Sequence, residues 1–248
     1  MADQFADHFS AQAGIYAEFR PQYPLGLFEW LSGLCAHHHL CWDAATGNGQ
    51  AAVALAAFFE KVYASDASAA QVREAIGRPN IEYAVEGAER TRLPDHTADL
   101  VTVAQAYHWF RHDVFHAEVA RVLKPGGLLA VWGYGLQAVA PSIDQLVRHY
   151  YEDIVGNYWP PERRHVENAY RDISFPFAAM ETPKFEIKVE YSLAEFIGYL
   201  RSWSATQRRL RETGQDPVSL IQDKLLAAWG PVEKREVRWP IFIRVGRR

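Results

Sequence analysis

A short glycine-rich segment within residues 41–52, Cys-Trp-Asp-Ala-Ala-Thr-Gly-Asn-Gly-Gln-Ala-Ala, has the composition of a nucleotide-binding loop. Its stretch Gly47-Asn-Gly-Gln-Ala-Ala52 fits the pattern G-x-G-x-x-A, in which the glycines let the backbone approach a dinucleotide closely. Asp66 follows about 20 residues later, where an acidic side chain can accept hydrogen bonds from ribose hydroxyls. The segment therefore predicts a site for a ligand that contains a nucleoside.

Asp43, just before the loop, distinguishes between two such ligands. A dinucleotide would bring its pyrophosphate to this turn, and two like charges about 4 Å apart cost on the order of several kcal/mol in a partly dry site. S-adenosylmethionine has no phosphate and carries an ammonium and a sulfonium, so the same carboxylate becomes favourable. Asp66 suits the ribose of either ligand. The residues favour S-adenosylmethionine, and an NAD(P)-dependent oxidoreductase is the alternative.

Short strands alternate with helices around this loop. Strands are expected at 40–45, 61–65, 81–85, 99–104 and 127–132, and helices at 25–37, 50–59, 69–76 and 114–123. This alternation predicts a parallel sheet wound on both faces, with the glycine loop at a strand-to-helix turn. Beyond residue 135 the pattern changes to a helix at 141–156 and an aromatic, arginine-rich loop at 157–177, which predict an inserted cap. A strand at 185–191, helices at 193–210 and 217–229 and a strand at 236–245 complete the chain.

The composition fits one α/β domain with an insertion, because 248 residues with 49% hydrophobic side chains can form one well-packed core. A net charge of −4 argues against nucleic acid as a partner. Cys35 and Cys41 lack the spacing of metal ligands and imply no disulfide framework. The longest apolar run, 51–59, is too short to span a bilayer. We expect a soluble cytoplasmic protein without a membrane partner.

Seven segments in a fixed order resemble the class I S-adenosylmethionine-dependent methyltransferases of the methyltransferase domain 11 type. More narrowly, they are similar to the branch of small-molecule enzymes that includes trans-aconitate methyltransferase. The segments are 19–24 (FRPQYP), 43–49 (DAATGNG), 66–68 (DAS), 87–94 (GAERTRLP), 98–101 (ADLV), 105–110 (QAYHWF) and 121–127 (RVLKPGG).

The resemblance implies an α/β fold with a doubly wound, Rossmann-like, seven-stranded and mostly parallel sheet, whose last strand is antiparallel, and a small helical cap. It divides the chain into a lid arm (1–24), a cofactor-binding core (25–135), a substrate cap (136–183) and the C-terminal part of the sheet with helices (184–248). The implied activity is methyl transfer from S-adenosylmethionine to a small-molecule acceptor, with S-adenosylhomocysteine as product. A carboxylic acid of the trans-aconitate type is one candidate acceptor, and the chain would act as a monomer or homodimer.

The resemblance also implies a set of cofactor contacts. The glycines would admit the methionine portion, Asp66 would bind the ribose, and Gln105 would line the methionyl side. Two positions depart from the family pattern, because Ala45 replaces its usual first glycine and Gly87 replaces an aspartate that often reaches the adenine amine. The implied cofactor-binding residues are Asp43, Ala45, Gly47, Gly49, Asp66, Ala67, Ala88, Glu89 and Gln105.

His108 is the candidate catalytic residue, because it follows the fourth expected strand and its side chain titrates near neutrality. Alignment can supply roughly 7 to 11 kcal/mol of a displacement barrier, so a general base is optional and His108 could instead line the substrate pocket. Arg20 could pair with an acceptor carboxylate in bidentate fashion or remain solvated on the N-terminal arm. The expected substrate-binding residues are Tyr16, Arg20, Tyr23, His108 and Trp109.

Three further features admit other interpretations. The segment from His112 to His116 imitates the H-E-x-x-H zinc motif but lacks a third ligand and lies in a helix between two expected strands, so we expect no metal. Arg163 and Arg164 would suit an acidic acceptor with an apolar body, although a plain surface loop is slightly favoured. A binding protein without turnover is a third possibility, since Ala45 departs from the pattern and no base is certain.

Overall fold

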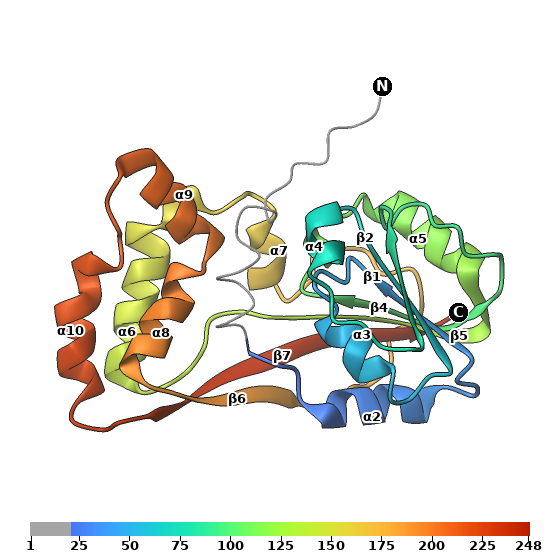
Figure 1. Cartoon of the computed structure of the whole chain (residues 1–248), viewed down its shortest axis with the longest axis horizontal. Helices are drawn as coiled ribbons and strands as arrows, with labels where there is room; N and C mark the ends of the chain where they lie inside the picture. The colour runs from blue at the N-terminus through green and yellow to red at the C-terminus, as the bar shows by residue number, and fades with distance from the viewer. Residues whose placement is uncertain (1–20) are drawn as a thin grey trace.

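The computed structural model describes residues 21–248, which form a seven-stranded sheet in the order β3-β2-β1-β4-β5-β7-β6 (Figure 1). Strands β1 to β5 are mutually parallel, and β7 runs antiparallel to both of its neighbours, β5 and β6. The expected mostly parallel sheet with an antiparallel last strand is thereby confirmed. The strands are β1 Leu40–Ala44, β2 Lys61–Asp66, β3 Ile81–Val85, β4 Ala98–Ala104, β5 Leu123–Tyr134, β6 Phe185–Tyr191 and β7 Arg235–Arg247.

Strand β5 shows why helices cover both faces of the sheet. Leu128 and Trp132 pack in the same core cluster as α2 (Leu25–Leu34) and α3 (Gln50–Leu55). Leu129 and Val131 belong to the other cluster, which includes α5 (His112–Val122). Successive strand side chains point to opposite faces, so a central strand that is apolar at every position from 128 to 132 requires cover on both sides. The short helix α4 (Ala69–Arg73) follows β2.

Most of the remaining helices form a lobe at one end of the sheet, away from α2 to α5 (Figure 1). Helix α6 (Pro141–His149) continues into the π-helical turn η3 (Tyr150–Ile154) and then the 3-10 turn η4 (Gly156–Tyr158). After β6 come α8 (Leu193–Arg201), α9 (Ser204–Thr213) and α10 (Ser219–Trp229), and α10 packs on α6. Helical segments that precede β6 in the sequence and helices that follow it therefore build this lobe together.

Several expected helices end earlier than the sequence pattern suggested, including α2 at Leu34 and α4 at Arg73. The helix expected over 193–210 is divided between α8 and α9, because Trp203 has extended backbone and buries its ring against Tyr150 and Tyr151. Thr206 bridges the break by donating to the Leu200 carbonyl at 2.9 Å. The helix expected over 50–59 ends at Leu55, and the Asn80 amide caps the carbonyls that follow it.

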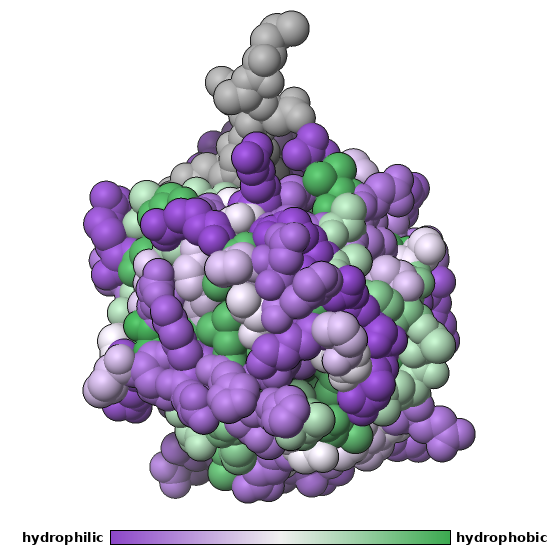
Figure 2. All heavy atoms as spheres, turned by 90° about the vertical axis from the view of Figure 1, so that its right-hand side faces the viewer, coloured by the Kyte–Doolittle hydropathy of each residue, from purple (hydrophilic) through white to green (hydrophobic). Residues whose placement is uncertain are grey.

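The surface is mainly hydrophilic on the face shown in Figure 2, with separate apolar spots. Exposed large apolar side chains lie on several elements, including Leu25 in α2, Val85 in β3, Val114 in α5 and Leu226 in α10. Scattered residues of this kind are normal on a folded protein. Among residues 21–248, no helix combines the length and the apolar character needed to cross a bilayer.

Candidate functional site

The glycine loop follows β1 and adopts left-handed backbone at three alternate positions, with φ of 52° at Ala45, 59° at Gly47 and 88° at Gly49. A Cβ atom at Gly49 would lie 2.2 Å from the Tyr83 hydroxyl oxygen, so this position needs glycine for space as well as for conformation. Ala45 adopts the left-handed conformation with a side chain, which costs about 1–2 kcal/mol. The position where the resemblance expected glycine is thus one where the backbone favours it.

Asp66, at the end of β2, is directly linked to this loop. One carboxylate oxygen accepts the Gly47 backbone N–H at 2.9 Å, and the other accepts the Ser68 N–H at 2.8 Å. Ala67 lies between Asp66 and Ser68 and is partly exposed. A carboxylate oxygen can accept more than one hydrogen bond, so these contacts orient the group without using its full capacity. The structure therefore brings Asp66, Ala67 and Gly47 together at the adjoining ends of β1 and β2.

Asp43 lies beneath the loop, with its side chain almost wholly buried. Thr46 donates to one carboxylate oxygen at 2.5 Å and Thr102 to the other at 2.7 Å. Burial raises the pKa of Asp43 to about 6, against the opposing effect of the two threonine hydroxyls. This carboxylate is therefore turned under the loop, where it shapes the turn and places a titratable negative charge behind it.

The expected adenine contacts lie after β3. Ala88 is 5% exposed and packs in the core cluster of the α5 face. Glu89 is less buried, and its carboxylate accepts the Arg111 backbone N–H at 3.1 Å. A Cβ atom at Gly87 would lie 3.4 Å from the Glu89 carboxylate, in ordinary contact. Glu89 thus holds the loop after β3 against the start of α5.

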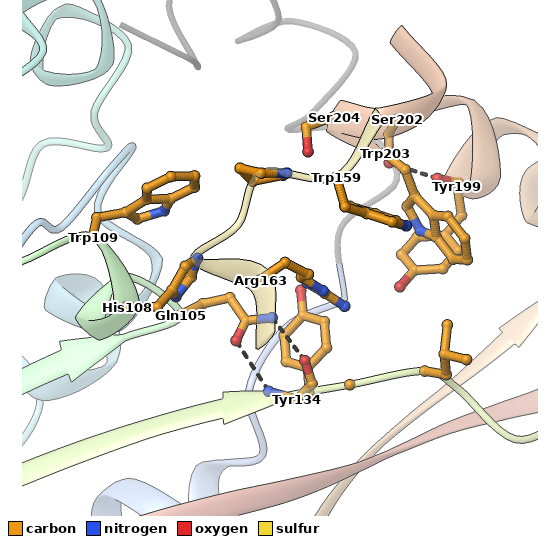
Figure 3. Close-up of a pocket in the computed structure, with 13 residues that line it drawn as sticks. Gln105, His108, Trp109, Tyr134, Trp159, Arg163, Tyr199, Ser202, Trp203 and Ser204 are labelled. Carbon is orange, nitrogen blue, oxygen red and sulfur yellow. Dashed lines mark hydrogen bonds between the residues drawn. The ribbon is translucent and has the colours of Figure 1, made fainter. Parts of the chain in front are cut away.

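A second feature, which we call the cap cavity, lies at the carboxyl ends of β4 and β5 beneath the helical lobe (Figure 3). Its volume is about 70 Å³. It brings together the predicted residues Gln105, His108 and Trp109 with side chains from the expected cap and from the α8–α9 break. The lining residues are Gln105, His108, Trp109, Tyr134, Gly135, Leu136, Trp159, Pro160, Arg163, Tyr199, Ser202, Trp203 and Ser204.

Gln105 closes the cavity wall between β4 and β5. Its backbone is left-handed, with φ of 60°, and its amide both accepts the Tyr134 N–H and donates to the Tyr134 carbonyl at 3.0 Å. A Cβ atom at Gly133 would lie 2.4 Å from the Gln105 amide oxygen. The amide therefore extends the pairing of the two strands and fixes the wall, and the side chain also lines the cavity.

His108 lies in the 3-10 turn η2 (Tyr107–Trp109) that follows β4. It is 7% exposed, and its ring lies 4.7 Å from that of Trp109 between centroids. The Nδ1 atom lies 3.1 Å from the hydroxyl oxygen of Tyr170. Tyr170 lies 62 positions away from His108 in the sequence, and no local pattern marks it as part of the site.

Arg163 opens α7 (Arg163–Glu167) and extends into the cavity between Gln105 and Trp159 (Figure 3). Its guanidinium lies 4.8 Å from the Trp159 ring centroid, and its Nε donates to the Tyr151 hydroxyl at 2.9 Å. Arg164, in contrast, is exposed. Arg163 thus lines the cavity, whereas Arg164 lies on the surface.

The expected lid residues Tyr16 and Arg20 lie outside the described residues. Tyr23 is half-buried at the base of the site, where its ring meets Trp132 edge-on at 5.6 Å and Tyr134 at 6.4 Å. Because Tyr134 lines the cap cavity, Tyr23 supports that wall from behind.

The two histidines of the segment that imitates a zinc motif, His112 and His116, both contact Tyr107 in η2. The His112 Nε2 lies 3.0 Å from the Tyr107 carbonyl, and the His116 Nε2 lies 2.6 Å from the Tyr107 hydroxyl. Burial lowers the pKa of His112, and it lowers that of His116 to about 4. Within residues 21–248, no three His, Cys, Asp or Glu side chains are arranged to hold a metal ion. Both rings instead anchor the turn that carries His108.

The sequence that forms the loop and the sheet edge is similar to that of known proteins. The model of a family described as a methyltransferase domain matches residues 42–131, which include the glycine loop and Asp66. A protein named a putative methyltransferase, from Dictyostelium discoideum, is 34% identical, and the match covers 97% of this chain and 94% of the relative. The chain belongs to the class I S-adenosylmethionine-dependent methyltransferases. S-adenosylmethionine is thus the methyl donor of this enzyme, and the oxidoreductase alternative is not supported.

Solved structures agree with this methyltransferase assignment. One titled a putative type II methyltransferase, from Anaeromyxobacter dehalogenans, is 45% identical with a TM-score of 0.87, and the match covers 92% of this chain and 98% of that one. A methyltransferase structure from Anabaena variabilis is 14% identical with a TM-score of 0.56, covering 93% and 99% of the two chains, and shares the fold alone.

S-adenosylmethionine fits the groups that this methyltransferase places at its sheet edge. Beside Gly47 the loop backbone is open, because among the described residues a Cβ atom there would meet only the Gln71 amide oxygen, at 3.8 Å, so a ligand has room to approach. Asp66 supplies a carboxylate at the end of β2, suited to ribose hydroxyls. Asp43 adds negative charge behind the loop, which suits a cationic ligand and opposes a phosphate.

Proposed function

We propose that this enzyme methylates a small molecule that carries a carboxylate on an apolar body, bound in the cap cavity. The observation that carries this proposal is the position of Arg163, whose guanidinium lines the cavity beside the face of Trp159. Arginine binds carboxylates through paired N–H groups, and tryptophan offers an apolar surface to the rest of the molecule. An acid of the trans-aconitate type, with several carboxylates, fits this combination.

The cofactor would lie along the neighbouring strand ends. Gly47 and Gly49 admit its methionine portion, Asp66 binds the ribose hydroxyls, and Ala67 with Ala88 and Glu89 borders the adenine. When bound, S-adenosylmethionine supplies a methyl group activated by its sulfonium. Gln105 stands between the glycine loop and the cavity, since it follows β4, which pairs with β1 on one side and with β5 on the other. Donor and acceptor would therefore meet at one edge of the sheet.

The cavity residues would act by orientation. Arg163 holds one carboxylate of the acceptor, and Trp109, Trp159 and Trp203 confine its body and exclude water. Alignment of this kind is worth up to roughly 7–11 kcal/mol in favourable systems. A carboxylate is already ionised at neutral pH, so no residue has to remove a proton from it. His108 then lines the cavity and contacts the acceptor.

Two measurements test the proposal in sequence. Calorimetric titration should give a dissociation constant in the micromolar range or below for S-adenosylhomocysteine and no binding of NAD or NADP. Transfer of a labelled methyl group should then be screened over small carboxylic acids, including trans-aconitate, each paired with its amide. We expect methylation of acids and not of their amides. Equal transfer to an amide would refute the carboxylate assignment, and the absence of binding would refute the cofactor placement.

A further inference from the structure

Tyr170 lies against His108 and is fully buried. Its ring stacks on that of His108 at 6.1 Å and meets Tyr107 and Phe242 edge-on at 5.3 Å and 5.0 Å. Its hydroxyl oxygen is the group 3.1 Å from the His108 Nδ1 atom. The side chain thus contacts the back of a residue that lines the cap cavity.

The backbone holds Tyr170 in an unusual conformation. Ala169 and Tyr170 both have left-handed φ, 51° and 59°, which costs about 1–2 kcal/mol for each residue with a side chain. The Tyr170 N–H donates to the His165 carbonyl at 2.8 Å, and its own carbonyl accepts from the Arg244 guanidinium. Such strain persists only where surrounding contacts hold it, and here those contacts aim one ring at His108.

The hydroxyl of Tyr170 keeps its proton and can therefore donate a hydrogen bond. Burial raises its pKa well above the ordinary value, although Arg163 and the backbone N–H groups of His108 and Tyr107 oppose the rise, so it remains protonated. Among residues 21–248, the group beside this hydroxyl that can accept its proton is the His108 Nδ1, at 3.1 Å. A buried donor without an acceptor costs about 1–3 kcal/mol. The proton of Tyr170 therefore points to Nδ1, which must accept it.

A neutral imidazole has one donor and one acceptor nitrogen, so the role of Nδ1 fixes the role of Nε2. We propose that Tyr170 is a positioning residue that holds His108 as a hydrogen-bond donor at Nε2 on the wall of the cap cavity. In this form His108 donates to an oxygen of the acceptor and does not take a proton from it at Nε2. The acceptor site itself rests on the proposed function. His108 and the Arg163 guanidinium then both offer donors that suit a carboxylate.

A second tyrosine–histidine pair in the same region provides an internal control. The Tyr107 hydroxyl lies 2.6 Å from the His116 Nε2, and Tyr107 contacts the Tyr170 ring. Removing the Tyr107 hydroxyl should therefore alter His116, and removing the Tyr170 hydroxyl should alter His108. Both changes, Tyr107→Phe and Tyr170→Phe, keep the aromatic ring and its packing.

The test is a long-range proton–nitrogen correlation spectrum of the full chain labelled with ¹⁵N-histidine, recorded near neutral pH with and without S-adenosylhomocysteine. The His108 signals are assigned as those lost in His108→Gln. We expect a proton on Nε2 and none on Nδ1 in the wild-type protein. Tyr170→Phe should shift the Nδ1 resonance of His108 and leave His116 in place, and Tyr107→Phe should do the reverse.

A proton on Nδ1 of wild-type His108 would overturn the proposal, and so would an unchanged His108 spectrum in folded Tyr170→Phe. The wild-type spectrum decides the question even where a variant fails to fold. Because the tautomer is measured without an acceptor, it is independent of the methylation screen. Failure of that screen would refute the proposed substrate class and leave the role of Tyr170 in place.

Discussion

The glycine loop at the ends of β1 and β2 and the cap cavity at the ends of β4 and β5 lie along one edge of the sheet but differ in chemistry. Around the loop, the side chains that matter are the carboxylates of Asp43 and Asp66. The cavity contains the Arg163 guanidinium and tryptophan rings. An acidic surrounding suits a cationic donor of methyl groups, and a basic aromatic surrounding suits an anionic acceptor. Under the proposed function, this contrast would position two ligands of opposite charge side by side.

The two regions also differ in how the chain builds them. Backbone conformation dominates at the loop, where left-handed residues and Gly49 decide the shape. Side chains from distant segments dominate in the cavity, where Arg163, His108 and Trp203 converge. Changes at the loop should thus affect cofactor affinity and folding together, whereas changes in the cavity should affect the acceptor alone.

The largest effect is expected from Gly49→Ala. The new Cβ would lie 2.2 Å from the Tyr83 hydroxyl oxygen, and the backbone φ of 88° would disfavour any side chain. We expect a loss of about 2–4 kcal/mol in the free energy of unfolding and a loss of measurable binding of S-adenosylhomocysteine. Urea unfolding and calorimetry measure the two. Gly77→Ala, with nothing within 4 Å of its Cβ, is the matched control, and equal behaviour of the two variants would contradict the role of the loop.

Asp43→Asn tests the buried charge beneath the loop. The pKa of this carboxyl is about 6 in the folded chain against an ordinary value of 3.8, so the folded state binds the proton more tightly. The stability that the protonated Asp43 carboxyl contributes is thus present at low pH. It is lost as the pH rises from about 4 to 6, by up to about 3 kcal/mol. Asparagine cannot titrate. We expect the variant to gain stability relative to wild type between pH 4 and pH 7.5 in urea unfolding, while its affinity for the cationic cofactor falls. A constant difference across this range would refute the raised pKa.

Asp66→Ala should weaken binding of S-adenosylmethionine by at least tenfold, because hydrogen bonds to a charged group are worth about 1.5–3 kcal/mol. The Gly47 and Ser68 N–H groups also lose their acceptor, so the loop itself should loosen. Calorimetric titration with S-adenosylhomocysteine measures the change in affinity. The control lies in the cavity, where Arg163→Gln should leave this affinity within about twofold. Unchanged affinity in Asp66→Ala would remove the ribose assignment.

Arg163→Gln should raise the KM of a carboxylic acid acceptor about tenfold, the effect of losing one charge-assisted interaction of about 1.4 kcal/mol. Turnover of the best acid from the methylation screen provides the measurement. Arg164→Gln is the matched control, since the neighbouring side chain is exposed and should have no effect on KM. Equal effects of the two substitutions would show that general positive charge, and not a cavity contact, attracts the acceptor.

The same contrast explains what the sequence could and could not reveal. The loop and the sheet were predictable because the glycine spacing and the alternation of strands and helices are local patterns, and local patterns survive folding. Nothing local identified Tyr170, Tyr199 or Ser202, because the cavity depends on the break between α8 and α9 and on left-handed backbone after α7. The arginine pair at 163 and 164 was visible, but only packing against Trp159 distinguishes its two members.

Ala45→Gly should give the smallest effect, a slight gain in stability. Removing the left-handed strain at Ala45 should raise the free energy of unfolding by about 1–2 kcal/mol. The greater freedom of glycine in the unfolded chain should lower it by about 0.5–1 kcal/mol. We expect a net stabilisation of about 1 kcal/mol or less, seen as a rise of a few degrees in Tm. Ala44→Gly, one residue earlier in buried and extended β1, should instead destabilise the chain. If both variants lose stability alike, the loop carries no strain at position 45, and the alanine fits this turn as well as glycine does.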